Sequence, residues 1–271
     1  MALEVEHLSY TYPKSAQPVL NDVSFTAPDG VVTSLIGANG VGKSTLIKSI
    51  LGLCPGAGRV RFNGAENAGL SKKVGYMTQQ GVLSTTLKVL EVVLLGRMQT
   101  LGFRVDGENL DRAWNIIKLL RLEPLAQRPY NTLSGGQQRV VGLAQTLVRE
   151  PELLLLDEPT ANLDMQNELE VMALVRAYTR QRSIATLVTL HDLNAAARFS
   201  DKLVLLKDGA VYREGTPVQV ITEDAIRAAY GVEAHVHTDR AGRTMLYPLR
   251  SVREQSYHFD KEVPDGTTGE S

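Results

Sequence analysis

Residues 37–45 read Gly37-Ala38-Asn39-Gly40-Val41-Gly42-Lys43-Ser44-Thr45. They match the pattern G-x-x-x-x-G-K-[ST], in which successive backbone N–H groups wrap phosphate oxygens, the lysine neutralises phosphate charge and the serine hydroxyl holds Mg²⁺. The apolar run 31–36 before this loop predicts a strand, and residues 44–51 after it have helical character. A helix that begins near the lysine adds its positive dipole end to the site. The sequence therefore predicts an α/β core with a nucleotide phosphate site at the end of its strand.

Two further motifs follow in a fixed order. The first is Leu133-Ser134-Gly135-Gly136-Gln137, which is expected to begin a helix. The second is the apolar run 153–156 followed by Asp157 and Glu158. Ligands of open α/β sheets bind at the carboxyl ends of the strands, so Asp157 is expected to hold Mg²⁺ directly or through water. Glu158 is predicted to be the general base, which would deprotonate a water molecule that attacks the γ phosphate of the nucleotide.

The three motifs in this order resemble those of the nucleotide-binding subunits of ATP-binding cassette (ABC) transporters, over roughly residues 1–250. The resemblance implies an α/β fold: a P-loop NTPase (RecA-like) core with an N-terminal antiparallel β subdomain and an inserted α-helical subdomain. It assigns residues 1–80 and 151–230 to the catalytic core with its β subdomain, and residues 81–150 to the helical subdomain. Residues 231–271 are expected to form a short C-terminal extension that contains a small hairpin and ends in a disordered tail.

The resemblance also implies how ATP and Mg²⁺ are held. Lys43 is expected to contact the β and γ phosphates, Ser44 to bind Mg²⁺ and Thr45 to reach the α phosphate. Tyr12 resembles the aromatic side chain that stacks on adenine in this family. Tyr10 is the rival for that role, and simple packing is the alternative for either ring.

Two residues beside the γ phosphate are inferred in the same way. His191 follows an apolar run at 185–190 and resembles the family's switch histidine. Gln79 resembles the glutamine that meets Mg²⁺ and the attacking water next to the helical region, although Gln80 could be confused with it. Thr78 stands where family members often have proline, which loosens the assignment of this loop.

The serine motif requires a second copy of the chain. Ser134, Gly135, Gly136 and Gln137 lie on the helical insertion, and Ser134 is not expected to reach the phosphates bound by its own chain. Glycines permit close backbone approach and a helix N-terminus favours an anion, so two chains facing head to tail would complete each other's ATP sites. Asp164, in a loop that resembles the one crossing the dimer interface, is expected to contact the partner.

Composition excludes several other classes of protein. The 271 residues carry 29 basic and 30 acidic side chains, so no global positive field attracts nucleic acid. No apolar run approaches the roughly 20 residues of a membrane span, and no secretion signal is recognised. The single cysteine, Cys54, is expected to be a small buried apolar residue. His235 and His237 alternate in the expected hairpin, where an exposed structural pair is favoured over a metal site.

These observations favour an ATPase that powers an ABC importer from the cytoplasmic face of the inner membrane. Its expected partners are membrane permease subunits, a second copy of the chain and a periplasmic or surface substrate-binding protein. The sequence most resembles ATPases for ferric siderophores, haem and vitamin B12 in the segments 187–194, 205–209, 214–217 and 230–234. The alternative is a soluble ABC ATPase that acts on an assembly scaffold. The sequence does not identify the cargo, because the ATP-binding subunits of this family do not contact it.

Overall fold

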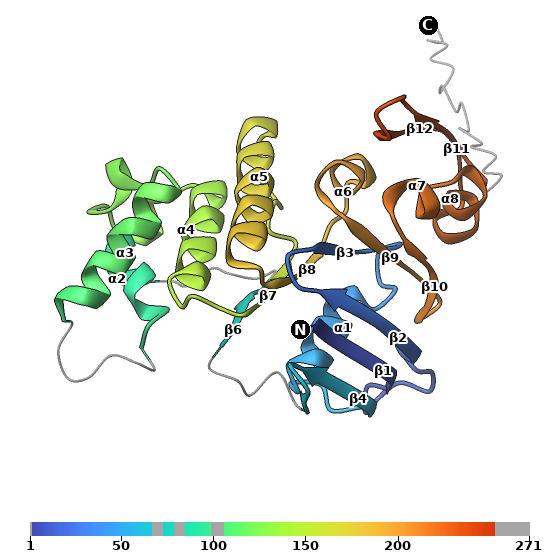
Figure 1. The fold of residues 1–271 in the computed structure, drawn as a ribbon, viewed down its shortest axis with the longest axis horizontal. Coiled ribbons are helices and arrows are strands. Elements are labelled where there is room, and N and C mark those ends of the chain that lie inside the picture. The colour runs from blue at the N-terminus through green and yellow to red at the C-terminus, as the bar shows by residue number, and fades with distance from the viewer. Residues whose placement is uncertain (1, 67–72, 79–84, 99–105, 253–271) are drawn as a thin grey trace, which may run out of the picture.

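A computed structural model of the chain describes residues 2–66, 73–78, 85–98 and 106–252 (Figure 1). The predicted site residue Gln79, its rival Gln80 and the tail expected to be disordered lie outside these residues. Within the described ranges, no helix has the length and apolar character required to span a membrane.

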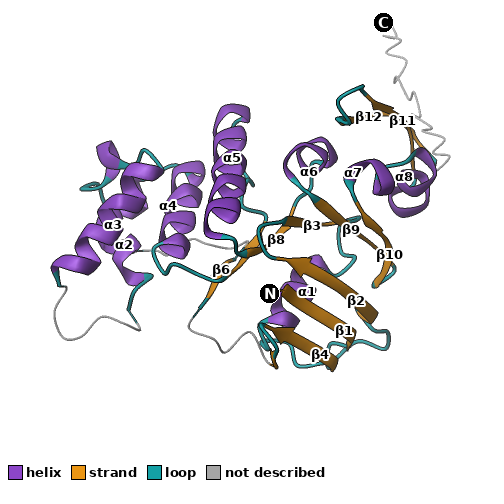
Figure 2. Ribbon diagram, viewed as in Figure 1, coloured by secondary structure: helices purple, strands orange, loops and turns teal. Residues whose placement is uncertain are grey.

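A six-stranded sheet forms the centre of the fold, in the order β10-β9-β3-β8-β7-β6 (Figure 2). Neighbouring strands are parallel except for the antiparallel hairpin β9–β10, which turns at Asp208 and Gly209. The bounds are Val32–Ile36 for β3, Val74–Met77 for β6, Leu153–Asp157 for β7, Ala185–Thr189 for β8, Lys202–Lys207 for β9 and Ala210–Gly215 for β10. The predicted α/β core is confirmed.

The central sheet is buried on both faces, which explains its unbroken apolar runs. On β7, Leu154 and Leu156 pack into one apolar cluster and Leu153 and Leu155 into another. The first cluster includes side chains of α4, α5, α6 and the C-terminal part, and the second includes side chains of α1 and of a second sheet. The helices are α1 (Lys43–Ile50), α4 (Gly135–Leu147), α5 (Met165–Arg182) and α6 (Leu193–Phe199). Each fully buried leucine contributes about 1.5–3 kcal/mol.

The second sheet is the predicted antiparallel β subdomain. Its four strands run in the order β2-β1-β4-β5. Their bounds are Ala2–Tyr10 for β1, Leu20–Pro28 for β2, Ala57–Phe62 for β4 and Ala65–Glu66 for β5. Gly58 is in β4, which pairs with β1. A Cβ at this position would lie 2.5 Å from the carbonyl oxygen of His7, so the close approach of the two backbones requires glycine. Cys54 is buried beside this sheet, as predicted.

The helical insertion lies between β6 and β7, on one side of the core (Figure 1). It has its own apolar cluster, to which α2, α3 and α4 contribute. Besides α4 it contains α2 (Val89–Leu95), α3 (Gly107–Leu119), η2 (Glu123–Leu125) and η3 (Tyr130–Thr132). Leu110 of α3 is 37% exposed. Asn109 is buried in its place, because the Asp106 carboxylate and the Arg97 guanidinium bind its amide.

The C-terminal part packs beside α6. It consists of α7 (Pro217–Val220), α8 (Glu223–Tyr230) and the antiparallel hairpin of β11 (Val232–Thr238) and β12 (Thr244–Ser251). The hairpin expected near residues 236–245 is therefore present and longer than the sequence suggested.

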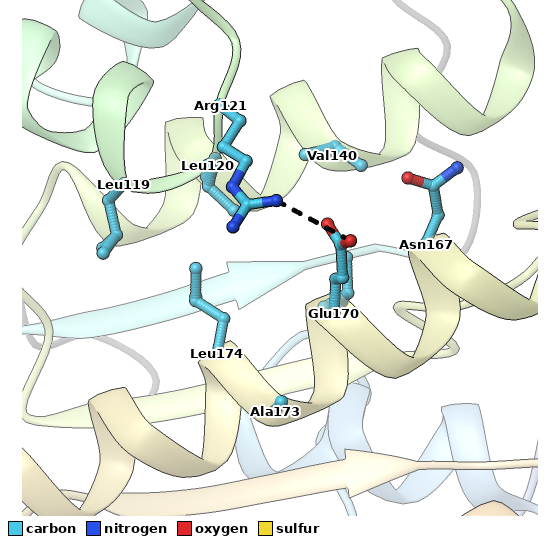
Figure 3. Close-up of a pocket in the computed structure, with 9 residues that line it drawn as sticks. Leu119, Leu120, Arg121, Val140, Asn167, Glu170, Ala173 and Leu174 are labelled. Carbon is cyan, nitrogen blue, oxygen red and sulfur yellow. Dashed lines mark ion pairs between the residues drawn. The ribbon is translucent and has the colours of Figure 1, made fainter.

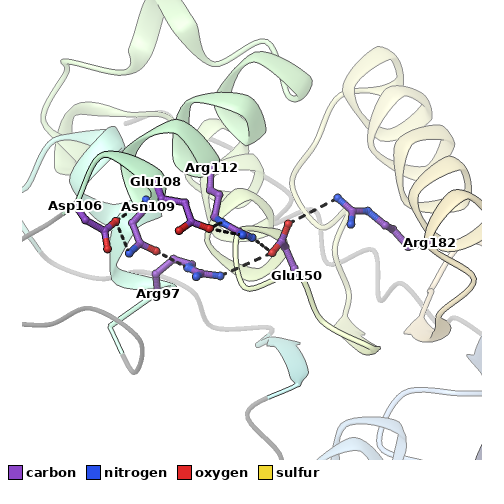
Figure 4. Close-up of polar contacts among 7 residues, drawn as sticks. All are labelled: Arg97, Asp106, Glu108, Asn109, Arg112, Glu150 and Arg182. Atoms are coloured by element: carbon purple, nitrogen blue, oxygen red, sulfur yellow. Dashed lines mark hydrogen bonds and ion pairs between the residues drawn. The ribbon is translucent and has the colours of Figure 1, made fainter.

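A cluster of charged side chains joins the helical insertion to the core at Glu150, just after α4 (Figure 4). Its carboxylate pairs with Arg112 of α3 and lies 4.0 Å from the Arg97 guanidinium. On the core side, the guanidinium of Arg182 at the end of α5 lies 3.8 Å away. One carboxylate therefore faces three guanidinium groups from both sides of the boundary.

A groove of about 290 Å³ runs along the same boundary (Figure 3). Leu120 and Val140 of the helical insertion form one wall, and Glu170 and Leu174 of α5 form the other. A single ion pair crosses it in the described structure, between Arg121 and Glu170 at 3.8 Å. The helical insertion thus meets α5 through charged contacts and open space as well as through apolar packing.

Replacing Glu150 with glutamine should lower the stability of the chain, because three arginines would lose the carboxylate that they share. Each pair is partly exposed, so we expect a loss of about 1 kcal/mol in the free energy of unfolding, and a smaller one in high salt. Glu108→Gln is the matched control, since among the described residues Glu108 forms an ion pair only with Arg112. Urea unfolding measures both variants. Equal losses would contradict a central role for Glu150.

Candidate functional site

The loop at 37–45 folds around the Lys43 side chain. Its ammonium group is buried and donates to the carbonyl oxygens of Gly37 at 2.7 Å and Ala38 at 3.1 Å. Burial lowers the pKa of Lys43, and the nearby carboxylates of Glu158 and Asp157 oppose that shift. A polyanion placed in the loop would favour the charged ammonium, so this lysine suits phosphate binding.

The first turn of α1 is open to a ligand. Gly42 is its N-cap, with a φ of 107°, and offers no side-chain hydrogen bond to the first N–H groups of the helix. A Cβ at Gly42 would lie 2.9 Å from the carbonyl oxygen of Val19, and one at Gly37 would lie 2.5 Å from that of Leu206. Both positions therefore need glycine. The free N–H groups and the helix dipole favour an anion at this end of α1.

Oxygen ligands for a hard cation converge beside the loop. The hydroxyl of Ser44 donates to the Asp157 carboxylate at 3.1 Å. The hydroxyl of Thr189 donates to the same carboxylate oxygen at 2.7 Å. Mg²⁺ prefers one or two protein oxygens and takes its other ligands from water and phosphates, so Ser44 and Asp157 fit this ion. No cluster of three or more His, Cys, Asp or Glu side chains suited to a metal occurs in the described ranges.

Glu158 and His191 lie together at the mouth of the site. Glu158 is 9% exposed and has a left-handed φ of 52°. Its backbone N–H donates to the Thr189 hydroxyl at 2.8 Å, and its carboxylate contacts Nε2 of His191. A fixed carboxylate beside an imidazole can accept a proton from water and keep its orientation.

These groups line one pocket of about 400 Å³. The lining consists of Tyr12, Val19, Asn39, Gly40, Gly42, Lys43, Ser44, Thr45, Glu158 and His191. The Tyr12 hydroxyl hydrogen-bonds to that of Thr45 at 3.0 Å, whereas Tyr10 packs against the apolar cluster of the β subdomain. The two rings meet edge to face, 5.0 Å between centroids. Tyr12 is thus the tyrosine that borders the pocket, and stacking on adenine stays a prediction.

The structure does not place the serine motif in this pocket. Ser134 caps α4: its hydroxyl accepts from the Gln137 N–H at 3.3 Å, and the Gln137 side chain accepts from the Ser134 N–H at 3.1 Å. Gly136 lies against the loop at 162–163. Asp164 caps α5 and accepts from the Asn167 N–H at 2.8 Å. The expected phosphate contact of Ser134 and interface contact of Asp164 therefore stay predictions about a second chain.

Two residues that support the site escaped the sequence analysis. The Thr189 hydroxyl bonds to both Asp157 and Glu158. The sequence signal for Thr189 was a polar residue at the end of an apolar strand, two positions before His191. Arg139 is buried and donates to the carbonyl oxygens of Asp157 at 2.9 Å, Glu158 at 3.0 Å and Thr78 at 3.1 Å. The sequence signal for Arg139 was a charged residue among the apolar residues of α4. His235, by contrast, lies on the exposed hairpin 3.3 Å from Glu223.

The chain resembles known transport ATPases in sequence. The family described as ABC transporter matches residues 20–161. An uncharacterised ABC transporter ATP-binding protein of Methanocaldococcus jannaschii is 41% identical, over 92% of this chain and 98% of its own. A hemin import ATP-binding protein of Bordetella pertussis is 36% identical, over 91% and 99%. A phosphonates import ATP-binding protein of Nitratidesulfovibrio vulgaris is 34% identical, over 86% and 92%.

Solved structures agree in fold. One chain, from a metal-chelate type ABC transporter in an inward-facing conformation, has a TM-score of 0.80 at 25% identity, covering 92% of this chain and 98% of its own. Another is a dimeric ATP-binding cassette in a post-hydrolysis state with ADP and phosphate bound. It has a TM-score of 0.72 at 30% identity, covering 79% and 98%.

Thr189→Val should slow ATP hydrolysis by about tenfold or more, because the isosteric side chain lacks the hydroxyl that accepts from the Glu158 N–H and donates to the Asp157 carboxylate. Thr186→Val is the matched control. Thr186 lies on the same strand, is equally buried and bonds to Thr179 away from the pocket. Steady-state hydrolysis rates compare the two variants. A similar rate in both would show that the Thr189 bridge is not needed for hydrolysis.

Proposed function

This chain belongs to the ABC transporter family as an ATP-binding subunit that hydrolyses ATP with Mg²⁺, and we propose that it powers the import of a metal chelate. The observation that carries the proposal is one pocket lined by Lys43, Ser44, Glu158 and His191, with the buried Asp157 carboxylate bonded to Ser44 beside it. It combines a phosphate loop, a cation site and a positioned base.

We assign the roles within the pocket as follows. Lys43 and the N–H groups of residues 37–45 bind the β and γ phosphates, and Ser44 with Asp157 holds Mg²⁺, which neutralises phosphate charge. Glu158 accepts the proton of the attacking water, and His191 holds that carboxylate toward the γ phosphate. Gln79, outside the described residues, is proposed to join the metal site to the helical part, residues 81–150. The catalytic part comprises residues 1–80 and 151–230.

The working unit in this proposal is a head-to-tail dimer. Ser134 and Asp164 lie outside their own chain's pocket and are exposed or half-exposed. A related cassette is dimeric in its post-hydrolysis state. Each copy would present Ser134 and the first turn of α4 to the γ phosphate bound by its partner.

The cargo is proposed to be a ferric siderophore, haem or a related chelate such as vitamin B12. The hemin importer relative and the metal-chelate type structure support this class. The phosphonate importer relative is the competitor. The partners would be membrane permease subunits and, through them, a substrate-binding protein, with this chain on the cytoplasmic face of the membrane.

Glu158→Gln should stop hydrolysis while ATP still binds, since the amide keeps the shape of the side chain and loses the base. The expected fall in rate is about 10²- to 10⁴-fold. Unhydrolysed ATP should then hold two chains together, because it stabilises the closed state by mass action. Size-exclusion chromatography with light scattering should show a dimer that depends on Mg-ATP.

Adding Ser134→Arg to the Glu158→Gln chain should abolish that dimer. A long cation does not fit a serine-sized gap between two backbones. If the single variant stays monomeric with Mg-ATP at high concentration, the composite site is wrong.

The cargo class can be tested with the membrane permease that co-purifies with the chain. In vesicles containing both, ATP-driven uptake of haem, a ferric siderophore or vitamin B12 is expected, with no uptake of a phosphonate. Lys43→Ala should abolish uptake, because no neutral side chain replaces its charge at the phosphates. Uptake of the phosphonate alone would refute the chelate class. Failure to retain any membrane partner would favour a soluble scaffold ATPase.

A further inference from the structure

One pair of residues fastens the C-terminal hairpin to the body of the chain. Val236 of β11 lies opposite Leu246 of β12. In an antiparallel ladder, alternate pairs turn their N–H and C=O groups away from the partner strand. Here the Val236 N–H donates to the Glu223 carboxylate of α8 at 3.2 Å, and the Leu246 N–H donates to the amide oxygen of Asn194 of α6 at 2.8 Å.

Asn194 binds Leu246 twice. Its Nδ2 also donates to the carbonyl oxygen of Leu246 at 3.2 Å. One side chain on α6 therefore pairs with the outer edge of β12 as the backbone of a third strand would.

The hairpin needs these contacts because few of its side chains are buried. On β12 only Thr244 and Leu246 are buried, whereas Met245, Tyr247 and Leu249 are exposed. A two-stranded hairpin is marginally stable by itself. Ala234 and Leu246 join the central apolar cluster, and the polar contacts at the edges of the hairpin add to that packing.

The backbone of Asn194 belongs to the turn that follows His191. Asp192 caps α6 and accepts from the N–H groups of Asn194 at 2.7 Å and Ala195 at 3.2 Å. The preceding residue, His191, contacts the Glu158 carboxylate. The start of α6 is therefore held by its own cap on one side and by the hairpin on the other.

The same C-terminal segment reaches the phosphate loop. Tyr230 ends α8, directly before the hairpin, and packs against the central apolar cluster. Burial raises the pKa of its hydroxyl, and a hydrogen bond with the backbone of Gly37 opposes that shift. The segment thus contacts the phosphate loop at Gly37 and, through Asn194, the helix that follows His191.

We propose that Asn194 is a positioning residue for ATP hydrolysis: by fastening the start of α6 to the backbone of Leu246, it keeps His191 against Glu158. The C-terminal hairpin is then a structural support of the catalytic pair. Displacements of reacting groups by about 1 Å slow catalysis strongly, so the loss of this contact is expected to slow the chemical step. Binding of ATP depends on residues 37–45, which Asn194 does not touch in the described structure, and is retained. The inference concerns hydrolysis and does not depend on the cargo.

Asn194→Ala tests the proposal in the full-length chain. The expected result is a fall of about tenfold in kcat with KM for ATP changed by less than about twofold. Asn194→Asp keeps the acceptor for the Leu246 N–H and loses the donor to its carbonyl, so we expect a kcat between those of wild type and Asn194→Ala. Asn194 lies on the exposed side of α6, where neither change disturbs the core.

Glu223→Ala is the matched control. It removes the contact with the Val236 N–H on the other edge of the same residue pair, together with the Glu223–His235 contact, on α8 rather than on the helix that follows His191. Its kcat should stay within about twofold of wild type. Wild-type kcat in Asn194→Ala, or an equal fall in Glu223→Ala, would overturn the proposal, because the anchoring of α6 would then be irrelevant or the effect would come from general loosening of the hairpin.

Discussion

The site depends on the adjacency of three parallel strands. Since β3, β8 and β7 are neighbours and run in the same direction, their carboxyl ends meet at one edge of the sheet. The phosphate loop follows β3, Thr189 ends β8, and Asp157 ends β7. Two hydroxyl groups, from Ser44 and Thr189, then bond to one Asp157 carboxylate and join the three strand ends. Residues more than 100 positions apart in the sequence thereby share one pocket.

The serine motif lies outside this arrangement. Lys43, Glu158 and His191 point into the pocket, whereas the Ser134 hydroxyl binds its own helix and lies outside it. Arg139 nevertheless ties α4 to the strand end that carries Asp157 and Glu158. The helix that begins at Ser134 is therefore joined to the strand end that carries Glu158, and in the proposed dimer its N-terminus would face the partner.

The boundary between the helical insertion and the core has a mixed character. Apolar packing joins α4 to the central sheet and to α5. A groove, the Arg121–Glu170 pair and the shared carboxylate of Glu150 also lie between the insertion and the core. Charged contacts across open space tolerate small rotations better than interdigitated side chains do, because dense packing fixes one arrangement. In the proposed transport cycle, this boundary would allow the helical part to move while the sheet and its site stay intact.

The sequence by itself determined the class of fold, the order of the elements and the residues of the phosphate loop, because these depend on local patterns: apolar runs, glycines in a loop and a lysine at a helix start. It also indicated Asp157 and Glu158, at the end of an apolar strand, and the family resemblance indicated His191. Only the tertiary structure revealed the bridge made by Thr189, the buried guanidinium of Arg139 and the anchor at Asn194. It also showed that Asn109, and not Leu110, is buried on α3. These features arise from contacts between segments far apart in the chain, and no local pattern of residues records which distant backbone group a side chain will meet.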